Sequence, residues 1–293
     1  KTKQPPTKGI QIQHDPANGS VSIKVGGKTS TEQYVLAEIY SQAFAAAGYE
    51  SSVKADLGDS IDTFAALQHG KIDAYAEYLT TALVELVNAR RDQVPGDTGE
   101  AHDFLDNELD RLGISVLPAA PFENSRGLAI TPELSAQLGI TRISELRDQA
   151  TQLSVAGPPD CKTDKYCLAL LRDAYSLQFK KYVPAKDTSA YDRLSDGSAD
   201  VAVVRTSDPE IADRRLILLD DDRDAFPPLN AALLMRDSTL AEAGPDLPSL
   251  AEQLRPFLTN SELQKLAAAV EFGHKSPQDA AHQFLVQHGF LAQ

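Results

Sequence analysis

The stretch from residue 21 to residue 48, VSIKVGGKTSTEQYVLAEIYSQAFAAAG, limits the possible folds more than any other part of the chain. Val21–Val25 alternates apolar and polar side chains, which is typical of a half-buried strand. Two glycines then permit a tight turn, and apolar residues recur at helical spacing from Leu36 to Ala47. A strand, a turn and a helix start form a common ligand platform, because free N–H groups point outward at the carboxyl end of the strand.

The start of this helix carries a predicted capping box, formed either by Ser30 with Gln33 or by Thr29 with Glu32. The GKT triplet just before it does not belong to a phosphate-binding loop. That motif requires a glycine five residues before the glycine of GKT, and Ser22 stands there. We therefore exclude a nucleotide site at this turn.

Length and charge limit the number of domains and the classes of binding partner. With 293 residues the chain can bury one or two large cores. Its formal net charge is −14 and its lysines and arginines are scattered, which excludes nucleic acid and anionic membranes as expected partners. No apolar run reaches the roughly 20 residues that a membrane-spanning helix needs.

Residues 1–20 are polar and contain several prolines and glycines, so we expect a loose N-terminal leader. They contain no apolar stretch of the kind found in a signal peptide. A mature exported protein and a cytosolic protein could both begin in this way, so composition leaves the compartment open.

Cys161 and Cys167 lie in a polar stretch. Two cysteines are too few for a tetrahedral zinc site, and their spacing is not C-x-x-C. The pattern favours a local disulfide in an oxidising compartment, because no apolar neighbours in the sequence explain two buried thiols; two reduced thiols are the alternative.

Strands and helices alternate along the chain, which predicts an α/β fold with largely parallel sheets. Two such blocks, 21–122 and 127–220, are joined by proline-marked crossings at 118–125 and 221–229. Two crossings predict two lobes with a hinge and an interlobe cleft. We expect lobe 1 at 21–124 and 230–293, and lobe 2 at 125–229. The expected strands are 21–25, 51–57, 72–78, 114–117, 127–131, 153–156, 199–204, 216–219 and 231–235, and the later helices include 143–149, 165–175, 189–194, 247–257, 262–271 and 277–288.

Four ordered motifs resemble the substrate-binding proteins of ABC importers for osmoprotectants such as glycine betaine, choline and carnitine. They are the GKTSTEQ segment at 27–33, the stretch from Ala66 to Thr81, the strand that ends near Asp208, and the segment from Leu219 to Asn230. The resemblance covers about residues 21–292. It implies a two-lobe, type II periplasmic-binding-protein fold without enzymatic activity or cofactor. It also implies a monomer that gives a small solute to an ABC permease, in the periplasm or as a lipoprotein outside the cell membrane.

Three departures from the family pattern concern the ligand. Such proteins hold a quaternary ammonium group in an aromatic cage, which attracts cations through the ring faces. Here Arg126 and Leu229 stand where the family has cage tyrosines, and Ser30 replaces a phenylalanine. A fixed charge at Arg126 would repel a trimethylammonium group. The alternative is therefore the same transport scaffold with a polar, anionic or aromatic hydroxyl ligand.

The candidate ligand contacts combine polar residues at the predicted helix start with residues at the ends of other strands and at the two crossings. The predicted contacts are Lys28, Ser30, Gln33, Tyr78, Thr81, Asn124, Arg126, Arg205, Asp208 and Leu229. Most of them have a structural alternative: capping and a solvated lysine at the helix start, core packing for Tyr78, and interlobe ion pairs of the arginines, for instance with Asp208 or Glu123.

Other chemistry is less well supported. The acidic run Asp220–Asp222 lacks the alternation and the glycine of a calcium-binding loop and is interpreted as a solvated face. No nucleophile–base pair or G-x-S-x-G motif indicates an enzyme. A receptor that reports ligand occupancy to a signalling partner remains a further alternative to a transport protein.

Overall fold

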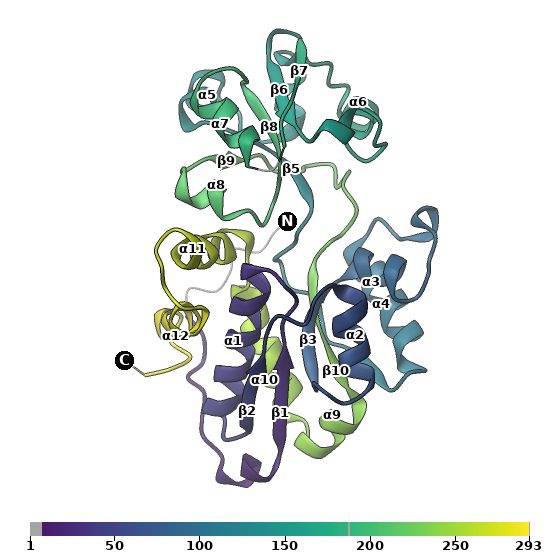
Figure 1. The fold of residues 1–293 in the computed structure, drawn as a ribbon, viewed down its shortest axis with the longest axis vertical. Helices are drawn as coiled ribbons and strands as arrows, with labels where there is room; N and C mark the ends of the chain where they lie inside the picture. Colours follow the sequence, from purple (N-terminus) through teal and green to yellow (C-terminus); the bar gives the residue numbers. More distant parts are fainter. Residues whose placement is uncertain (1–7, 187, 293) are drawn as a thin grey trace. The chain divides into compact units, whose positions relative to one another are not determined.

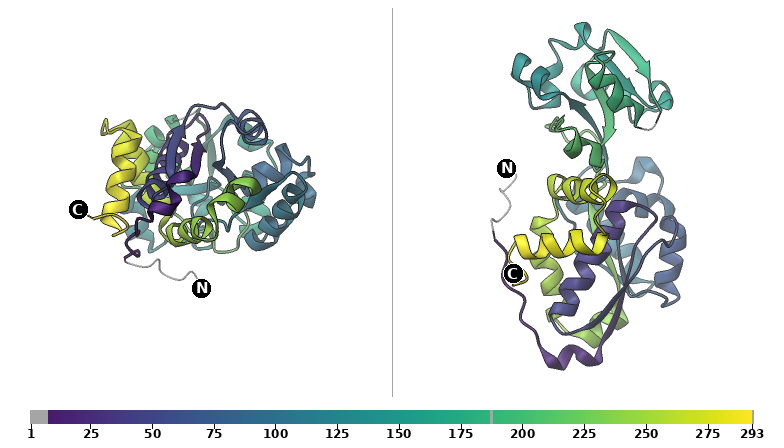
Figure 2. Two further views of the ribbon diagram at one scale, coloured as in Figure 1. Left: turned by 90° about the horizontal axis from the view of Figure 1, so that it is seen from below. Right: turned by 60° about the vertical axis from the view of Figure 1, so that its left-hand side comes forward.

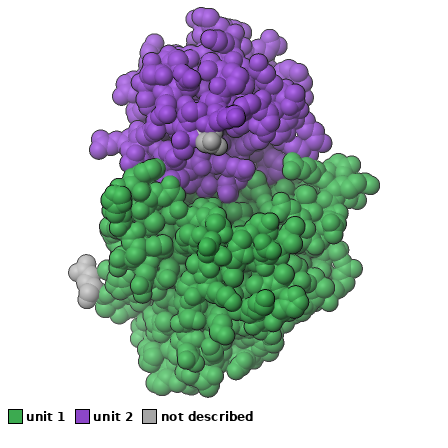
Figure 3. All heavy atoms as spheres, viewed as in Figure 1, with its two compact units in different colours: residues 1–123, 228–293 green, residues 124–227 purple. Residues whose placement is uncertain are grey.

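The computed structural model describes residues 8–186 and 188–292. The chain forms two compact units, which Figure 3 shows in different colours. Unit 1 comprises Lys1–Glu123 and Pro228–Gln293, and unit 2 comprises Asn124–Pro227. The chain therefore passes twice from one unit to the other. Each unit has its own sheet and its own hydrophobic core, and the predicted α/β class is confirmed.

Unit 1 is built on a five-stranded sheet with the order β2-β1-β3-β10-β4 (Figure 1). Its strands are Ser22–Gly26 (β1), Glu50–Lys54 (β2), Ala74–Tyr78 (β3), Ile114–Val116 (β4) and Ala231–Arg236 (β10). β1 pairs in parallel with β2 and β3, whereas β10 pairs antiparallel with β3 and β4. The prediction of a largely parallel sheet is therefore wrong, because β10 enters from the second crossing and runs against its neighbours.

Helices cover both faces of this sheet. One core cluster joins Tyr78 to side chains of α1, α10, α11 and α12, and another joins Tyr75 to side chains of α2, α3 and α4. The two tyrosines thus face opposite sides of β3, as strand alternation predicts. The helices are Thr31–Ala46 (α1), Ser60–Gln68 (α2), Leu79–Glu85 (α3), Thr98–Asp110 (α4), Asp237–Ala243 (α9), Asp246–Leu254 (α10), Asn260–Glu271 (α11) and Pro277–Gln287 (α12), with 3-10 turns at Pro16–Ser20, Arg91–Gln93 and Arg255–Phe257.

The C-terminal helices complete the core of unit 1. Figure 2 shows α12 beside α1, and the side-chain Nε2 of Gln42 on α1 donates to the carbonyl oxygen of Gln278 on α12 at 2.9 Å. Ala281, Phe284 and Leu285 of α12 are buried in the same cluster as the apolar residues of α1. The long helix that follows the glycine turn is therefore fixed along its length by the other end of the chain.

Residues 8–20 differ from the loose leader that the sequence predicts. The backbone N–H of Gly9 donates to the carbonyl of His288 at 2.7 Å, and that of Ile12 donates to Phe290 at 2.9 Å. Ile12 is also partly buried against the core of unit 1. A few backbone hydrogen bonds and one apolar side chain are enough to hold this polar segment. Residues 1–7 of the predicted leader lie outside the described residues.

Unit 2 also has a mixed five-stranded sheet, with the order β7-β6-β8-β5-β9. β6 pairs in parallel with β7 and β8, and β5 pairs antiparallel with β8 and β9. The strands are Arg126–Ile130 (β5), Ser154–Gly157 (β6), Lys181–Pro184 (β7), Val201–Arg205 (β8) and Ile217–Leu218 (β9), and the helices are Pro132–Leu138 (α5), Leu168–Tyr175 (α6), Ser189–Ser195 (α7) and Pro209–Asp213 (α8), with 3-10 turns at Ile143–Leu146, Ala150–Gln152 and Pro159–Lys162.

Several elements differ from the sequence prediction. β7 was not predicted, because it is an edge strand without a fully buried residue and lacks clear apolar alternation. The short helices α8 and α9 were also missed, and residues 143–149, predicted as α-helix, form only a 3-10 turn over Ile143–Leu146. Short elements carry too few residues for periodicity to identify them.

The structure joins Cys161 and Cys167 in a disulfide, with their Cα atoms 5.1 Å apart. The polar sequence around them predicts few apolar contacts, but both cysteines are buried and belong to the core of unit 2 with Leu171 and Tyr175. The burial of both cysteines, despite their polar sequence neighbours, has a simple cause. The cysteines flank a turn that folds over α6, so their contacts come from residues that are not their immediate sequence neighbours.

Candidate functional site

Three strand ends meet at one edge of the unit 1 sheet. β1 and β3 are parallel, with Gly26 opposite Tyr75, so both strands end on this side. β10 is antiparallel to β3 and places its first residue, Ala231, opposite Tyr78. The edge therefore brings together the residues after β1, the residues after β3 and the residues before β10. These contribute the six unit 1 candidates: Lys28, Ser30, Gln33, Tyr78, Thr81 and Leu229.

A buried ion pair of Lys28 and Glu77 forms the centre of this edge. The Nζ of Lys28 contacts Oε1 of Glu77 and lies 3.3 Å from the hydroxyl of Ser60. The hydroxyl of Tyr75 donates to the other carboxylate oxygen of Glu77 at 3.2 Å, and the N–H of Tyr78 donates to Oε1 at 2.8 Å. Because the carboxylate is fully buried, these donors are needed to offset the cost of removing it from water. Burial, followed by the charge of Glu77, raises the pKa of Tyr75 well above its ordinary value, so this hydroxyl remains a donor.

The ring of Tyr78 is held from several sides. The Nζ of Lys28 lies 4.4 Å from its ring centroid, a cation–π distance, and the ring of Phe122 is tilted against it with centroids 6.3 Å apart. Its hydroxyl donates to Oε1 of Glu32 at 3.1 Å. Tyr78 thus belongs to the core, as the structural alternative supposes, and also lies at this edge of the sheet.

Gln33 lies in the first turn of α1 and has an unusual environment. The residue is 1% exposed, yet within the described part of the chain neither its Nε2 nor its Oε1 has a hydrogen-bond partner. An unsatisfied buried amide costs about 1–3 kcal/mol. The predicted capping boxes also fail: Ser30 is the N-cap residue without a side-chain bond, and Thr29 instead donates to Asp56 at 2.8 Å. The start of α1 therefore keeps polar groups that the protein itself does not use.

The segment before β10 is attached to the start of α3. The hydroxyl of Thr80 donates to the carbonyl of Pro228 at 2.7 Å, and the N–H of Leu79 donates to the carbonyl of Asn230 at 3.1 Å. These bonds hold Leu229, which is half-buried against the cluster that contains Tyr78. Thr81, the next residue on α3, is half-buried.

Unit 2 has a comparable edge where β5 begins and β8 ends. Arg126 lies directly opposite Arg205 in the antiparallel pair. The parallel strand β6 ends on the same side, which brings the segment 158–164 to this edge. The four unit 2 candidates lie here: Asn124, Arg126, Arg205 and Asp208.

The charge of Arg126 is paired with carboxylates of unit 2. Nη1 of Arg126 donates to Asp164 at 2.7 Å, and its Nη2 lies 3.4 Å from a carboxylate oxygen of Asp160. The alternative that paired Arg126 with Asp208 or Glu123 therefore named the wrong carboxylates. The sequence reasoning missed Asp160 and Asp164, although their position on either side of Cys161, in the turn that follows a strand, was a usable signal.

Arg205 and Asp208 are held by the loop that follows β8. Oδ2 of Asp208 accepts the N–H of Arg205 at 3.1 Å and the hydroxyl of Tyr191 at 2.5 Å, while Nη1 of Arg205 donates to the carbonyl of Asn124 at 3.4 Å. The side-chain Oδ1 of Asn124 is buried and has no hydrogen-bond partner in the described ranges. Each edge therefore presents one amide with unused capacity, Gln33 in unit 1 and Asn124 in unit 2.

No cluster of histidine, cysteine, aspartate and glutamate side chains suited to a metal ion occurs within residues 8–186 and 188–292. Over the same residues, none of the helices has both the length and the apolar character needed to cross a membrane.

Comparisons with known proteins agree with the fold and the motifs. A family model of the substrate binding domain of ABC-type glycine betaine transport systems matches residues 21–287. The glycine-betaine-binding protein of Pseudomonas aeruginosa is 26% identical over 281 residues, which cover 92% of this chain and 89% of that protein. The carnitine transport binding protein OpuCC of Listeria monocytogenes is 24% identical over 276 residues, which cover 92% of this chain and 88% of that protein.

Solved structures show the same fold. The crystal structure of a glycine betaine/carnitine/choline ABC transporter protein superposes with a TM-score of 0.82 at 20% identity, over 92% of this chain and 99% of the other. The family itself is shown by the family model, which matches residues 21–287 and so spans most of the chain. The chain belongs to the family of substrate binding domains of ABC-type glycine betaine transport systems.

Proposed function

We propose that this chain captures a small osmoprotectant, of the glycine betaine or carnitine type, outside the cytoplasm and delivers it to the permease of an ABC importer. Proteins of this family are substrate-binding proteins of transporters and not enzymes. Family membership supports the transport role, and the two relatives named for glycine betaine and carnitine support the ligand class. Both solutes combine a quaternary ammonium group with a carboxylate.

The observation that carries this proposal is the unpartnered amide of Gln33. Its Nε2 can donate to a ligand carboxylate, and its location at the start of α1 adds the favourable field of a helix N-terminus. A solute that bonds this amide removes the cost of an unsatisfied buried group, so binding gains more than the bond alone. In unit 2, the Oδ1 of Asn124 also lacks a hydrogen-bond partner among the described residues and can accept one from a solute.

We propose the other predicted residues as further ligand contacts within each unit. In unit 1 we assign the ring of Tyr78 and the side chain of Leu229 to the apolar body of the solute, and the hydroxyls of Ser30 and Thr81 to its polar groups. Lys28 acts through Tyr78, whose ring it contacts. In unit 2 we assign polar contacts to Arg126, Arg205 and Asp208.

Charge pairing bears directly on whether a quaternary ammonium group can bind. Arg126 alone would repel such a group, but Asp160 and Asp164 both lie within ion-pair distance of its guanidinium. The three side chains together carry one net negative charge. The repulsion that the sequence predicts is therefore offset, and the osmoprotectant class is compatible with Arg126.

One observation favours the second candidate, a polar, anionic or aromatic hydroxyl solute on the same transport scaffold. The Nζ of Lys28 lies 4.4 Å from the Tyr78 ring centroid, so the protein's own cation already occupies one face of this aromatic ring. Leu229 moreover offers no ring where the family has a cage tyrosine. A solute without a buried cation would suit such surroundings.

A thermal-shift screen separates the two candidates. Solutes that bind only the folded protein raise its Tm by mass action. The proposal predicts a rise with glycine betaine, choline or carnitine, followed by saturable binding in calorimetry. A rise confined to organic acids, polyols or aromatic hydroxyl compounds would establish the second candidate. No rise with any of these compounds would contradict both.

A further inference from the structure

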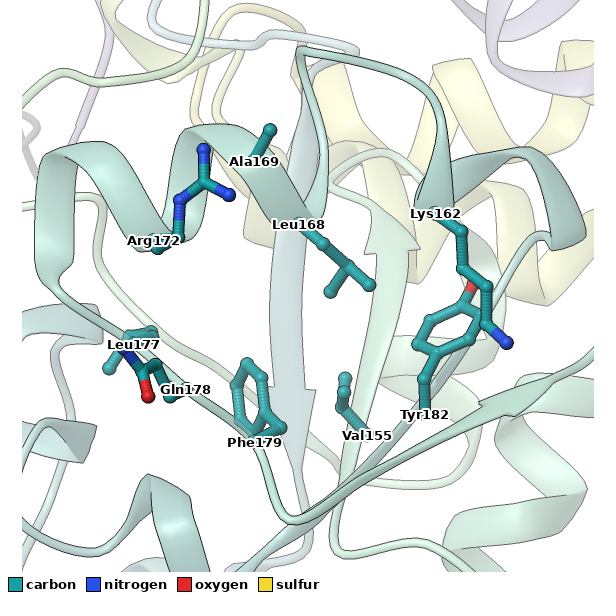
Figure 4. A pocket seen from close by; sticks show the side chains of 9 residues that line it. All are labelled: Val155, Lys162, Leu168, Ala169, Arg172, Leu177, Gln178, Phe179 and Tyr182. Atoms are coloured by element: carbon teal, nitrogen blue, oxygen red, sulfur yellow. The ribbon is translucent and has the colours of Figure 1, made fainter.

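Unit 2 contains a pocket that none of the predicted solute contacts lines. It lies between α6 and the strands β6 and β7, and its volume is about 270 Å³. Figure 4 shows Leu168 projecting from α6 toward Val155 and Phe179, which come from β6 and from the loop before β7. Ligand sites typically measure about 300–1,000 Å³, so this pocket suits a small organic molecule.

The lining of the pocket combines apolar and polar side chains, and its two charged side chains are both cations. Val155, Leu168, Leu177 and Phe179 supply aliphatic and aromatic surface, and none of the lining side chains is a carboxylate. The cations are Lys162 and Arg172, which stand on two sides of the pocket in Figure 4. In a chain with a formal net charge of −14, the side chains that line this pocket include two cations and no carboxylate.

Both cations retain capacity to bind an anion. Lys162 forms no ion pair with any residue that the structure describes, and its Nζ lies 5.6 Å from the ring centroid of Tyr182. Arg172 pairs through Nε with the exposed neighbour Asp173 at 2.8 Å, which leaves both Nη groups without a hydrogen bond inside the described ranges. An Arg fork and a Lys ammonium are the side chains best suited to a carboxylate.

The pocket is fixed by bonds that do not depend on a ligand. The disulfide of Cys161 and Cys167 closes the turn that carries Lys162 and leads into α6. On the other side, the hydroxyl of Tyr182 donates to the carbonyl of Pro158, and burial raises the pKa of this tyrosine to about 12, so the donor persists at neutral pH. A preformed site binds without a large ordering cost.

We propose that this pocket is a second binding site, specific for a small organic anion with an apolar body, such as an aromatic or medium-chain carboxylate. The apolar body packs on Leu168, Leu177 and Phe179, and the carboxylate lies between Lys162 and Arg172. None of the predicted solute contacts lines this pocket, so the proposal neither requires nor excludes the proposed transport ligand.

Titration of the isotope-labelled full chain with benzoate, followed by NMR, tests the proposal. We expect saturable shifts at residues of the pocket with a Kd of about 1 mM or tighter, and no saturation with neutral benzamide. Lys162→Gln/Arg172→Gln should weaken benzoate binding at least about tenfold. Lys165→Gln/Lys181→Gln removes the same charge from exposed positions outside the pocket and should leave binding unchanged.

A blocking variant provides a second, independent readout. Ala169 lines the pocket and is only half-buried, so Ala169→Phe should fill the space without unfolding α6 and should abolish benzoate binding. The proposal is overturned if benzoate does not saturate, if both charge variants weaken it equally, or if Ala169→Phe binds benzoate as the wild type does. Gln33→Leu should not change benzoate binding, which keeps this site distinct from the proposed solute contacts.

Discussion

Replacing Gln33 by leucine should improve folding and impair binding at the same time. The residue is 1% exposed and neither amide atom is bonded within the described residues. Removing an unsatisfied buried amide should raise the free energy of unfolding by about 1–3 kcal/mol. For a protein of this size that corresponds to a Tm higher by about 2–5 °C. Loss of the hydrogen bond to the solute should lower affinity about 10- to 100-fold.

The assay combines scanning calorimetry of the ligand-free protein with titration of the solute that gives the largest thermal shift. Gln264→Leu is the matched control, because Gln264 is also buried in unit 1, at 6% exposure, but has an interaction partner in the chain. We expect Gln264→Leu to lower the Tm and to leave affinity unchanged. The reasoning is refuted if Gln33→Leu lowers the Tm as the control does and binds the solute normally, since the amide would then serve the fold.

Three further predictions concern stability. Lys28→Met leaves the carboxylate of Glu77 buried without its counter-charge and should lower the free energy of unfolding, measured in urea, by about 3–5 kcal/mol. The double variant Lys28→Met/Glu77→Gln should regain most of this stability. If the single and the double variant lose the same amount, the cause is not electrostatic. Cys161→Ser opens a short disulfide loop and should lower the free energy of unfolding in the same titration by about 2 kcal/mol. If a reducing agent does not change the stability of the wild type, the disulfide is contradicted. The hydrogen bond from His288 lowers the pKa of Glu262 from 4.5 to about 2, so the stability it adds is complete above about pH 4.5 and is lost as the pH falls toward 2. Glu262→Gln should remove this pH dependence. If the free energy of unfolding of the wild type and of the variant changes with pH in parallel, Glu262 is not its source.

Local sequence patterns predicted the elements that carry their own periodicity. The strand over Val21–Val25, the glycine turn and the helix after it could be predicted because their apolar residues recur at the period of a strand or of a helix. The opposite orientation of Tyr75 and Tyr78 followed from strand alternation. β7 is not predicted from the sequence, because a half-exposed edge strand needs no alternation of apolar and polar residues.

The contacts that define the candidate site were not predictable in the same way. Lys28 and Glu77 are 49 residues apart, and only the parallel pairing of β1 with β3 brings them together. Both were visible in the sequence as polar residues at strand ends, but their pairing is a tertiary property. Gln33 shows the opposite limit: a capping box predicts a partner for its amide, whereas the folded helix provides none.

Arg126 shows why a single replaced residue does not determine a ligand. A lone guanidinium 4 Å from a cation would repel it by about 4 kcal/mol near a protein surface. Asp164 lies 2.7 Å from this guanidinium and Asp160 lies 3.4 Å from it, so a solute experiences all three charges. The sign of the field therefore depends on carboxylates that lie 34 and 38 positions further along the chain. Ligand specificity at this strand edge therefore depends on the summed charge of Arg126, Asp160 and Asp164. Loss of an aromatic residue there weakens the cation–π attraction but does not by itself create repulsion.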